Sequence, residues 1–177
     1  KDGEEDGLWT IWYENGQKWI ERTYKDGKEI RIIQWEYYEN GQKKEEVTYK
    51  DGERDGLGTS WYENGQTRWE ATFKDGKEDG LFTKWYENGQ KESEGTYKDG
   101  EKDGKWVEWY ENGEKSREGT FKDGKEDGLM TEWYENGQKE EEVTYKDGKQ
   151  HGLWTAWYDN GNQKSELNYI NGKMNDS

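Results

Sequence analysis

Apolar and polar residues alternate in short stretches of this chain, and the alternation returns at a fixed interval. Residues 12–16 read Trp-Tyr-Glu-Asn-Gly, and six further copies follow, one with Tyr first and one with Asp in place of Glu. The second aromatic residue lies at positions 13, 38, 62, 86, 110, 134 and 158. The interval is 25 residues once and 24 residues five times, which is typical of a repeat array.

Each repeat has the pattern of a β-hairpin. Residues 8–13 alternate as a strand does, Asn15-Gly16 follows, and residues 17–24 form a second candidate strand before a connector at 25–29. Asn-Gly between such stretches predicts a two-residue type I′ turn, in which both residues have positive φ. Aromatic residues favour the flanking strands because they pack well on a pleated surface.

Seven successive hairpins predict the fold class. We expect an all-β protein: an elongated single-layer antiparallel β-hairpin repeat array with seven repeats of about 24 residues, each burying its aromatic residues against its neighbours. A single array would occupy residues 1–177. Its second repeat is irregular around residues 28–37, and its degenerate last part, residues 162–177, has the polar character of a C-terminal cap.

Strand alternation assigns side chains to two faces. One face takes Leu8, Thr10 and Trp12, and the other takes Trp9, Ile11 and Tyr13. The predicted turn pairs Tyr13 with Lys18, Trp12 with Trp19 and Trp9 with Arg22. Because most equivalents of Arg22 are small, we expect the face of Trp9 to be concave. A slip of register by one residue would exchange the two faces.

The second repeat departs from the pattern. It is one residue longer than the others and lacks the glycine that ends their connectors. It also gathers apolar residues at Ile30, Ile32, Ile33 and Trp35. An added residue in a strand indicates a bulge or a rebuilt connector. Two interpretations stay open: packing of an irregular segment, or a docking point for a partner.

Composition alone is typical of a disordered chain. Leu, Ile, Val and Phe together number 18 of 177 residues, 39% of residues are charged, and the net charge is −15. However, Tyr and Trp number 25 and recur at fixed phase, so they supply buriable area that a disordered chain lacks. The sequence therefore predicts a folded array.

The charge and the missing residue types exclude several functions. An acidic chain disfavours nucleic acid and anionic membranes, which both need basic surfaces, and suits a basic protein partner. The chain has no Cys, which excludes disulfides, and no apolar run of the roughly 20 residues that a membrane span needs.

No catalytic group, metal site or cofactor is predicted. The carboxylates occupy repeat positions, so no acid–base pair stands out. His151 is the only His and replaces a connector Asp, so we expect an exposed loop residue. The connectors at 75–80 and 123–128 resemble part of a calcium loop, but the intermediate ligands and the closing Glu do not fit. A turn held by Asp and Gly explains them without metal.

The repeat resembles the second type of MORN motif, a bacterial variant, most closely at residues 104–124 and 128–148. The resemblance covers the whole chain and implies an elongated array of antiparallel hairpins. Some members are grouped with the YwqK-like antitoxins, which implies that they bind and neutralise a toxin. Choline- and glucan-binding repeats are also similar, but their period is nearer 20 residues.

The resemblance and the mid-repeat start at Lys1 leave the localisation open. The bacterial cytoplasm is favoured. Because the N-terminus is interpreted as trimmed or processed, a secreted or surface location is the alternative.

We therefore expect a non-catalytic protein-binding module, antitoxin- or immunity-like, that presents an acidic, aromatic-lined ribbon to a protein partner such as a basic toxin or effector. The alternative is a glycan or cell-wall binding module that uses stacked Trp and Tyr. The candidate partner-binding residues are Ile30, Ile32, Ile33, Trp35, Trp9, Tyr13, Phe82, Trp106, Met130 and Trp154. Two interpretations stay open for the row of Trp9, Phe82, Trp106, Met130 and Trp154: core, which is favoured, or a ligand platform. One aromatic row on a sheet one layer thick should stay partly exposed and so mark a binding surface.

Overall fold

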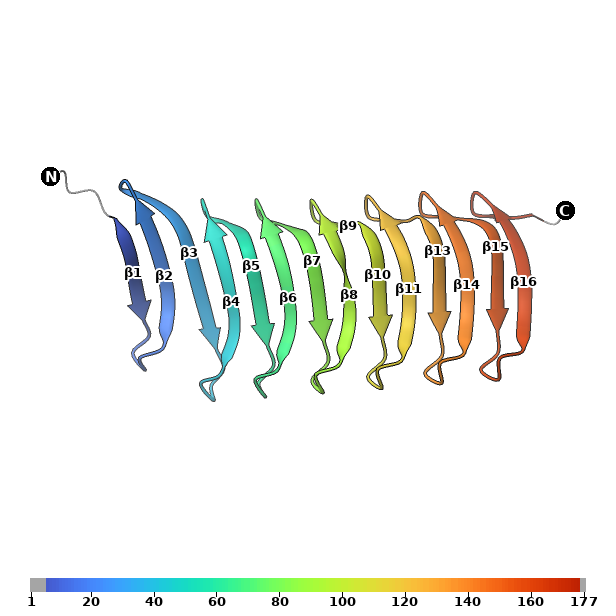
Figure 1. Ribbon diagram of the computed structural model, residues 1–177, viewed down its shortest axis with the longest axis horizontal. Coiled ribbons are helices and arrows are strands. Elements are labelled where there is room, and N and C mark those ends of the chain that lie inside the picture. Colours follow the sequence, from blue (N-terminus) through green and yellow to red (C-terminus); the bar gives the residue numbers. More distant parts are fainter. Residues whose placement is uncertain (1–5, 176–177) are drawn as a thin grey trace. The chain divides into compact units, whose positions relative to one another are not determined.

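The computed structural model describes residues 6–175 as strands and tight turns, without a helix (Figure 1). Neighbouring strands pair antiparallel, which confirms the predicted all-β fold of repeated hairpins. No helix that could span a membrane is found in this part of the chain. The predicted mid-repeat start at Lys1 and the last two residues of the predicted cap lie outside the described residues.

The chain divides into two compact units, the first ending at Gly80 and the second beginning at Leu81, within β7 (Lys77–Trp85). The other strands of the first unit are β1 (Gly7–Trp12), β2 (Lys18–Lys25), β3 (Lys28–Tyr37), β4 (Lys43–Lys50), β5 (Glu53–Trp61) and β6 (Thr67–Lys74). The second unit contains β8 (Lys91–Lys98), β9 (Glu101–Lys102), β10 (Gly104–Trp109), β11 (Lys115–Lys122), β12 (Lys125–Glu126), β13 (Gly128–Trp133), β14 (Lys139–Lys146), β15 (Lys149–Trp157), β16 (Gln163–Ile170) and β17 (Lys173–Met174).

The Asn-Gly turns are not the predicted type I′ turns. The amide of Tyr13 donates to the carbonyl of Gln17 (2.8 Å), and that of Gly16 donates to the carbonyl of Tyr13 (3.0 Å). Gly16 has a φ of 85°, whereas Asn15 is not among the residues with positive φ. This is a three-residue loop, a type I turn followed by a left-handed glycine. The loop is one residue longer than predicted, so only its glycine needs the left-handed conformation.

The type I′ turns lie instead in the segments that the sequence suggested as connectors. Asp26 and Gly27 have φ values of 51° and 71°, and Lys25 pairs with Lys28 around them. The predicted connector at 25–29 is therefore wrong, because two residues suffice to turn the chain and Lys28 already starts β3. Asp-Gly meets the same conformational requirement as Asn-Gly.

The strand register agrees with the prediction away from the Asn-Gly turn. Trp9 lies opposite Arg22, and Thr10 lies opposite Glu21, so the two faces hold the predicted residues. Nearer the turn, Trp12 lies opposite Lys18, and Trp19 is an extra residue in a bulge. The predicted pairs of Trp12 with Trp19 and of Tyr13 with Lys18 are wrong, since the longer loop shifts the pairing by one residue.

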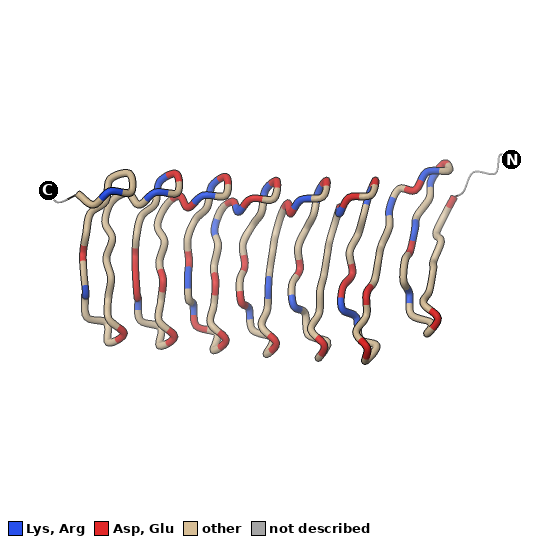
Figure 2. Tube along the Cα trace, turned by 180° about the vertical axis from the view of Figure 1, so that it is seen from behind, with Lys and Arg blue, Asp and Glu red and all other residues tan. Residues whose placement is uncertain are grey.

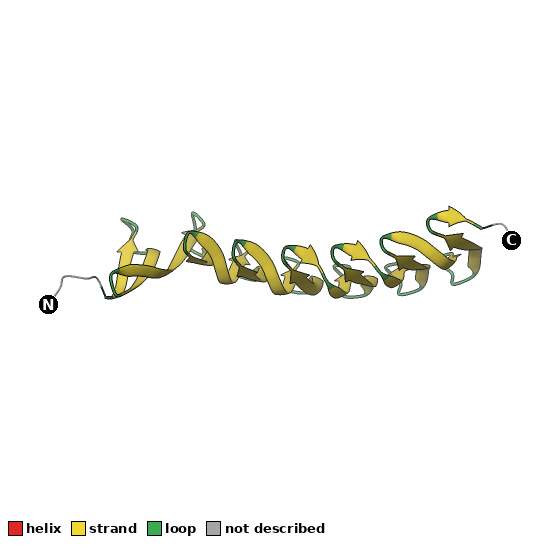
Figure 3. Ribbon diagram, turned by 90° about the horizontal axis from the view of Figure 1, so that it is seen from above, coloured by secondary structure: helices red, strands yellow, loops and turns green. Residues whose placement is uncertain are grey.

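A second irregularity lies in the strand that leaves each regular Asp-Gly turn. Between the pairs Tyr49–Arg54 and Val47–Gly58, one residue of β4 faces three residues of β5. Gly56 has a φ of 104° there. Bulges bend a strand, and Figure 3 shows bowed strands in both units.

The side of the sheet that carries Trp9, Ile11, Tyr13 and their equivalents contains most of the core. We call it the core face. Its buried apolar residues are Val47, Ala71 and Phe73 in the first unit, and Trp106, Met130, Val143 and Ala156 in the second. We call the other side the leucine face. It buries a threonine in most repeats (Thr59, Thr83, Thr131 and Thr155), whereas its leucines are exposed.

Two glycines on the core face allow large residues of the next repeat to pack. A Cβ on Gly95 would lie 2.2 Å from the Trp106 ring, and one on Gly119 would lie 1.7 Å from Sδ of Met130. The deduction that small residues accompany large ones is thus confirmed, but the closest partner of each glycine belongs to the following repeat.

This difference in neighbours predicts unequal effects of the same substitution. Gly95→Ala should lower the free energy of unfolding by about 2–3 kcal/mol, because the buried Trp106 ring cannot bend away. Gly119→Ala should cost only about 1 kcal/mol, because the Met130 thioether is flexible. Urea unfolding of both variants checks this, and equal losses would contradict it.

Candidate binding surfaces

The tyrosine of the repeated pentapeptide joins neighbouring copies. Its hydroxyl donates to the backbone carbonyl of the Trp one repeat later. These bonds are Tyr38 to Trp61 (2.8 Å), Tyr86 to Trp109 (2.7 Å), Tyr110 to Trp133 (2.6 Å) and Tyr134 to Trp157 (2.9 Å). Burial, with nearby carboxylates adding, raises the pKa of Tyr86 and of Tyr110. These hydroxyls therefore remain protonated donors.

The asparagine of the pentapeptide makes a similar pair of contacts. Oδ1 of Asn112 accepts from the amide of Glu114 (2.9 Å), and its Nδ2 donates to the carbonyl of Glu135 in the next copy (3.0 Å). Asn40, Asn88 and Asn136 make equivalent inter-repeat bonds. The most regular side chains of the repeat thus hold the array together.

Removing one tyrosine hydroxyl should reveal this role. Tyr110→Phe is expected to lower the free energy of unfolding by about 0.5–1.5 kcal/mol, the usual contribution of one such hydrogen bond. Thermal unfolding followed by circular dichroism measures the loss. A variant as stable as the parent would show that the bond to Trp133 contributes nothing.

The leucine face carries a repeated arrangement of Lys, Glu and Trp. Nζ of Lys115 lies 5.8 Å from the ring centroid of Trp133 and pairs with Glu118. Hydrogen bonds from Lys105 and Lys115 lower the pKa of the Glu118 carboxyl. The same arrangement surrounds Lys43, Lys91 and Lys139. Such exposed pairs stabilise a fold by only about 0–1 kcal/mol each.

The aromatic residues predicted on the core face differ in burial. Trp106 and Met130 are 4% and 2% exposed, whereas Trp9 is 53% exposed. Phe82 and Trp154 are half-buried. This row of the core face therefore contains both core residues and surface residues.

A cluster forms around Trp106 in the second unit. Its ring stacks on Phe82 (centroids 5.9 Å apart, planes at 28°) and meets Tyr97 edge to face (5.0 Å, 80°). Nζ of Lys102 lies 4.0 Å from the Trp106 centroid, beside a hollow of about 370 Å³. Lys102, which sequence reasoning missed, thus already supplies a cation to this cluster.

Charged side chains of the core face next to this cluster pair with one another. Arg117 contacts Glu126 (2.6 Å) and Glu132 (3.3 Å). Burial raises the pKa of the Glu132 carboxyl, Arg117 opposes the shift, and Glu141 adds to it. Arg117 therefore offsets part of the cost of holding the Glu132 charge there.

The four apolar residues of the second repeat lie in different environments. Trp35 is 6% exposed, its Nε1 donates to Oε2 of Glu46 (2.7 Å), and Nζ of Lys18 lies 5.3 Å from its ring centroid. Ile32 and Ile33 are half-buried, while Ile30 is exposed. Trp35 therefore contributes to packing, and Ile30 is the most accessible of the four.

The second repeat is displaced along the strand direction relative to the first. By analogy with the pair Glu45–Ser60, Ile20 should face Glu36, but it faces Gln34 instead. The second repeat has one residue more than the other repeats. The bulge in β3 after its Asp-Gly turn also contains one residue fewer than the equivalent bulge in β5. The result is an offset of two residues, roughly 7 Å. Figure 1 shows the β3–β4 hairpin reaching lower than the β1–β2 hairpin.

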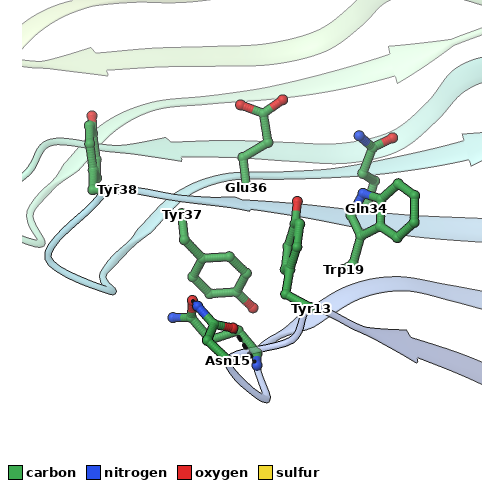
Figure 4. Close-up of a pocket in the computed structure, with 8 residues that line it drawn as sticks. Tyr13, Asn15, Trp19, Gln34, Glu36, Tyr37 and Tyr38 are labelled. Carbon is green, nitrogen blue, oxygen red and sulfur yellow. Dashed lines mark hydrogen bonds between the residues drawn. The ribbon is translucent and has the colours of Figure 1, made fainter.

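This offset creates a hollow of about 420 Å³ between the first two repeats, which we call the offset pocket (Figure 4). It is lined by Tyr13, Asn15, Gln17, Trp19, Gln34, Glu36, Tyr37 and Tyr38. Of these only Tyr13 was a predicted site residue. The signal that could have indicated Trp19 is its departure from the other repeats, which have Lys, Arg, Glu or Ser at the equivalent position.

In the described part of the chain, no three His, Asp or Glu side chains gather to hold a metal ion.

His151 is a correction to the sequence-based expectation. It is half-buried within β15 rather than exposed in a loop, because the turn ends at Lys149. Its Nδ1 is buried without a hydrogen-bond partner within residues 6–175.

In each unit, therefore, short hairpins alternate two kinds of tight turn and bond to the next copy through Tyr and Asn. These features define a β-hairpin repeat protein. The sequence matches the MORN repeat variant at residues 5–26, 34–51, 54–75, 78–99, 102–123, 126–147 and 150–171. The chain belongs to this family, whose repeats generally serve binding.

No curated protein matches the chain. Among solved structures, a protein of unknown function from Bacteroides fragilis, determined by crystallography at 1.90 Å resolution, is 10% identical in sequence. The match covers 95% of this chain and 94% of that protein, with a TM-score of 0.17. A TM-score of this size does not establish a shared fold.

Proposed function

We propose that the chain is a non-catalytic protein-binding module whose partner presents a basic surface. The observation that carries this proposal is the leucine face. Leu8, Leu57, Leu81, Leu129 and Leu153 occupy the same repeat position and are each 50–62% exposed. Apolar residues that recur on an exposed face are typical of an interaction surface, because a monomer gains nothing by displaying them.

Charge selects the kind of partner. The chain has 42 acidic and 27 basic residues. The acidic residue of every Asn-Gly turn is exposed: Glu14, Glu39, Glu63, Glu87, Glu111, Glu135 and Asp159. Figure 2 shows acidic positions in red at the turns along one edge of each unit. Such a distribution attracts and orients a basic protein.

Within this class, we propose an antitoxin- or immunity-like role, in which binding masks the active surface of a basic toxin. The support is the family resemblance of the repeat together with the acidic edge. Absence of catalysis follows from the same proposal, because the pentapeptide side chains are engaged between copies rather than gathered at one reactive centre.

A salt series tests the proposal. A partner is first isolated on the immobilised chain, identified by mass spectrometry and then prepared pure. Its Kd should rise at least ten-fold between about 50 and 200 mM salt, because exposed charges are screened within about 10 Å at 0.1 M. Replacing Leu129 and Leu153 by Ser should weaken binding without unfolding the chain. A salt-independent Kd would contradict the proposal.

A glycan partner is the second candidate, favoured by the exposed rings of Trp12 and Trp19. Stacking of sugars on aromatic rings responds little to salt. Retention of the chain on insoluble cell-wall polysaccharide at 500 mM salt would support this alternative instead.

A further inference from the structure

The offset pocket combines aromatic rings with a single charged group. We propose that it binds the guanidinium group of an arginine side chain presented by the protein partner. The inference rests on the proposed function, since it names how one residue of a basic partner would be held. It also explains what an irregular repeat contributes to an otherwise uniform array.

The aromatic wall comes from both sides of the two-residue offset. The ring centroid of Tyr13 lies 5.8 Å from that of Trp19, with an interplanar angle of 37°. It lies 6.1 Å from the ring centroid of Tyr37, with an interplanar angle of 86°. Tyr13 and Trp19 are 39% and 40% exposed, so their rings are accessible from solvent. A planar guanidinium stacks on such rings and is attracted by their π-electrons.

Glu36 supplies the negative charge and is the only charged residue among the described residues that line the pocket. Its Oε2 contacts Nζ of Lys44 at 3.2 Å, and both side chains are about half exposed. An exposed pair of this kind is weak. An arriving guanidinium, which binds a carboxylate with two parallel hydrogen bonds, can therefore replace Lys44.

The floor of the pocket is held in place before any ligand arrives. Nδ2 of Asn15 donates to Oε1 of Gln17 (2.8 Å), and Nε2 of Gln17 donates to the carbonyl of Gly41 (2.7 Å). The first bond lies within the turn of the first repeat, near Asn15 in Figure 4. The second joins this turn to the turn of the second repeat. A preformed site loses less entropy on binding.

Comparison with the Trp106 cluster of the second unit supports a cationic ligand. There, an aromatic cluster lies beside a hollow of similar size, and Lys102 of the chain itself lies over the rings. In the offset pocket, none of the lining residues in the described part of the chain is Lys or Arg. The partner would supply the cation that the chain provides for itself elsewhere.

The test follows the indole Nε1–H signal of Trp19 in the ¹⁵N-labelled chain, assigned with Trp19→Phe. The probe is acetyl-Gly-Arg-Gly-amide, compared with the same peptide containing citrulline, which is neutral and of equal shape, or lysine. We expect a saturable shift with arginine, a weaker one with lysine and none with citrulline.

Three charge variants are expected to change the affinity for the arginine peptide in different ways. Glu36→Gln should weaken binding of the arginine peptide at least ten-fold, Lys44→Gln should strengthen it by removing the competing charge, and Glu53→Gln should leave it unchanged. Glu53→Gln is the control, since it removes the same charge from an exposed residue of the first unit that does not line the pocket. The ¹⁵N spectrum of each variant reports whether it folds.

Equal shifts with arginine and citrulline, or an affinity indifferent to Glu36→Gln, would overturn the inference. That outcome is distinct from failure of the proposed function. If a basic partner binds the parent chain and Glu36→Gln equally well, only the role of the pocket is refuted. If the pocket binds arginine but the chain shows no salt-sensitive protein partner, the proposed function is refuted.

Discussion

Trp106→Ala is expected to lower the free energy of unfolding by about 3–5 kcal/mol, the usual loss when a large buried aromatic residue is removed. Trp106 is 4% exposed and contacts Phe82, Tyr97 and Phe121. Because Gly95 has no side chain with which to fill the space, the cavity cannot close. Urea unfolding followed by fluorescence measures the loss.

Trp9→Ala is the matched control, since Trp9 occupies the same repeat position but is 53% exposed. Trp9→Ala should lower the free energy of unfolding by roughly half as much as Trp106→Ala, or less, in proportion to the area that the Trp9 side chain buries. Equal losses would show that the position, and not its burial, decides stability. A stable Trp106→Ala variant would show that the ring is a binding platform rather than core.

Regularising the second repeat is expected to remove the offset pocket and weaken partner binding by more than about 2 kcal/mol, as loss of a central contact usually does. The change replaces residues 28–37 by the nine residues of β5 (Glu53–Trp61), which restores the common repeat length. Thermal stability should stay the same or rise, because every inter-repeat contact then has its regular form. Calorimetric titration with the purified partner measures the affinity.

The matching control exchanges the same nine residues for those of β15 (Lys149–Trp157) within the third repeat but keeps Gly58, because a side chain there would meet Phe73 and Trp69. It should leave affinity unchanged. If the regularised chain binds as tightly as the parent, or if it unfolds, the second repeat is only structural.

Several features of the fold follow from the sequence because they depend on spacing alone. The interval of the pentapeptide sets the number of hairpins, and alternation around Trp9 and Thr10 fixes the two faces. The place of the irregularity was also visible, since the second repeat is one residue longer and lacks a glycine. Such local signals can be recognised in the sequence because they do not depend on a distant residue.

The turn types show where local signals are ambiguous. Asn15-Gly16 and Asp26-Gly27 satisfy the same requirement for left-handed backbone, so either pair fits a type I′ turn. Which pair forms the type I′ turn depends on the number of loop residues between the paired ends of the two strands. At Asn15-Gly16 the loop has three residues because Trp19 forms a bulge, and that bulge depends on pairing along the whole hairpin.

The sequence by itself determined the repeat, the hairpin and the two faces, because strand periodicity is a local property. Only the tertiary structure decided that Trp106 is buried and Trp9 exposed, since burial depends on the copy packed against each ring. It also decided that Tyr110 and Asn112 bond to the next copy. The offset pocket belongs to the same category, because a two-residue displacement exists only between paired repeats.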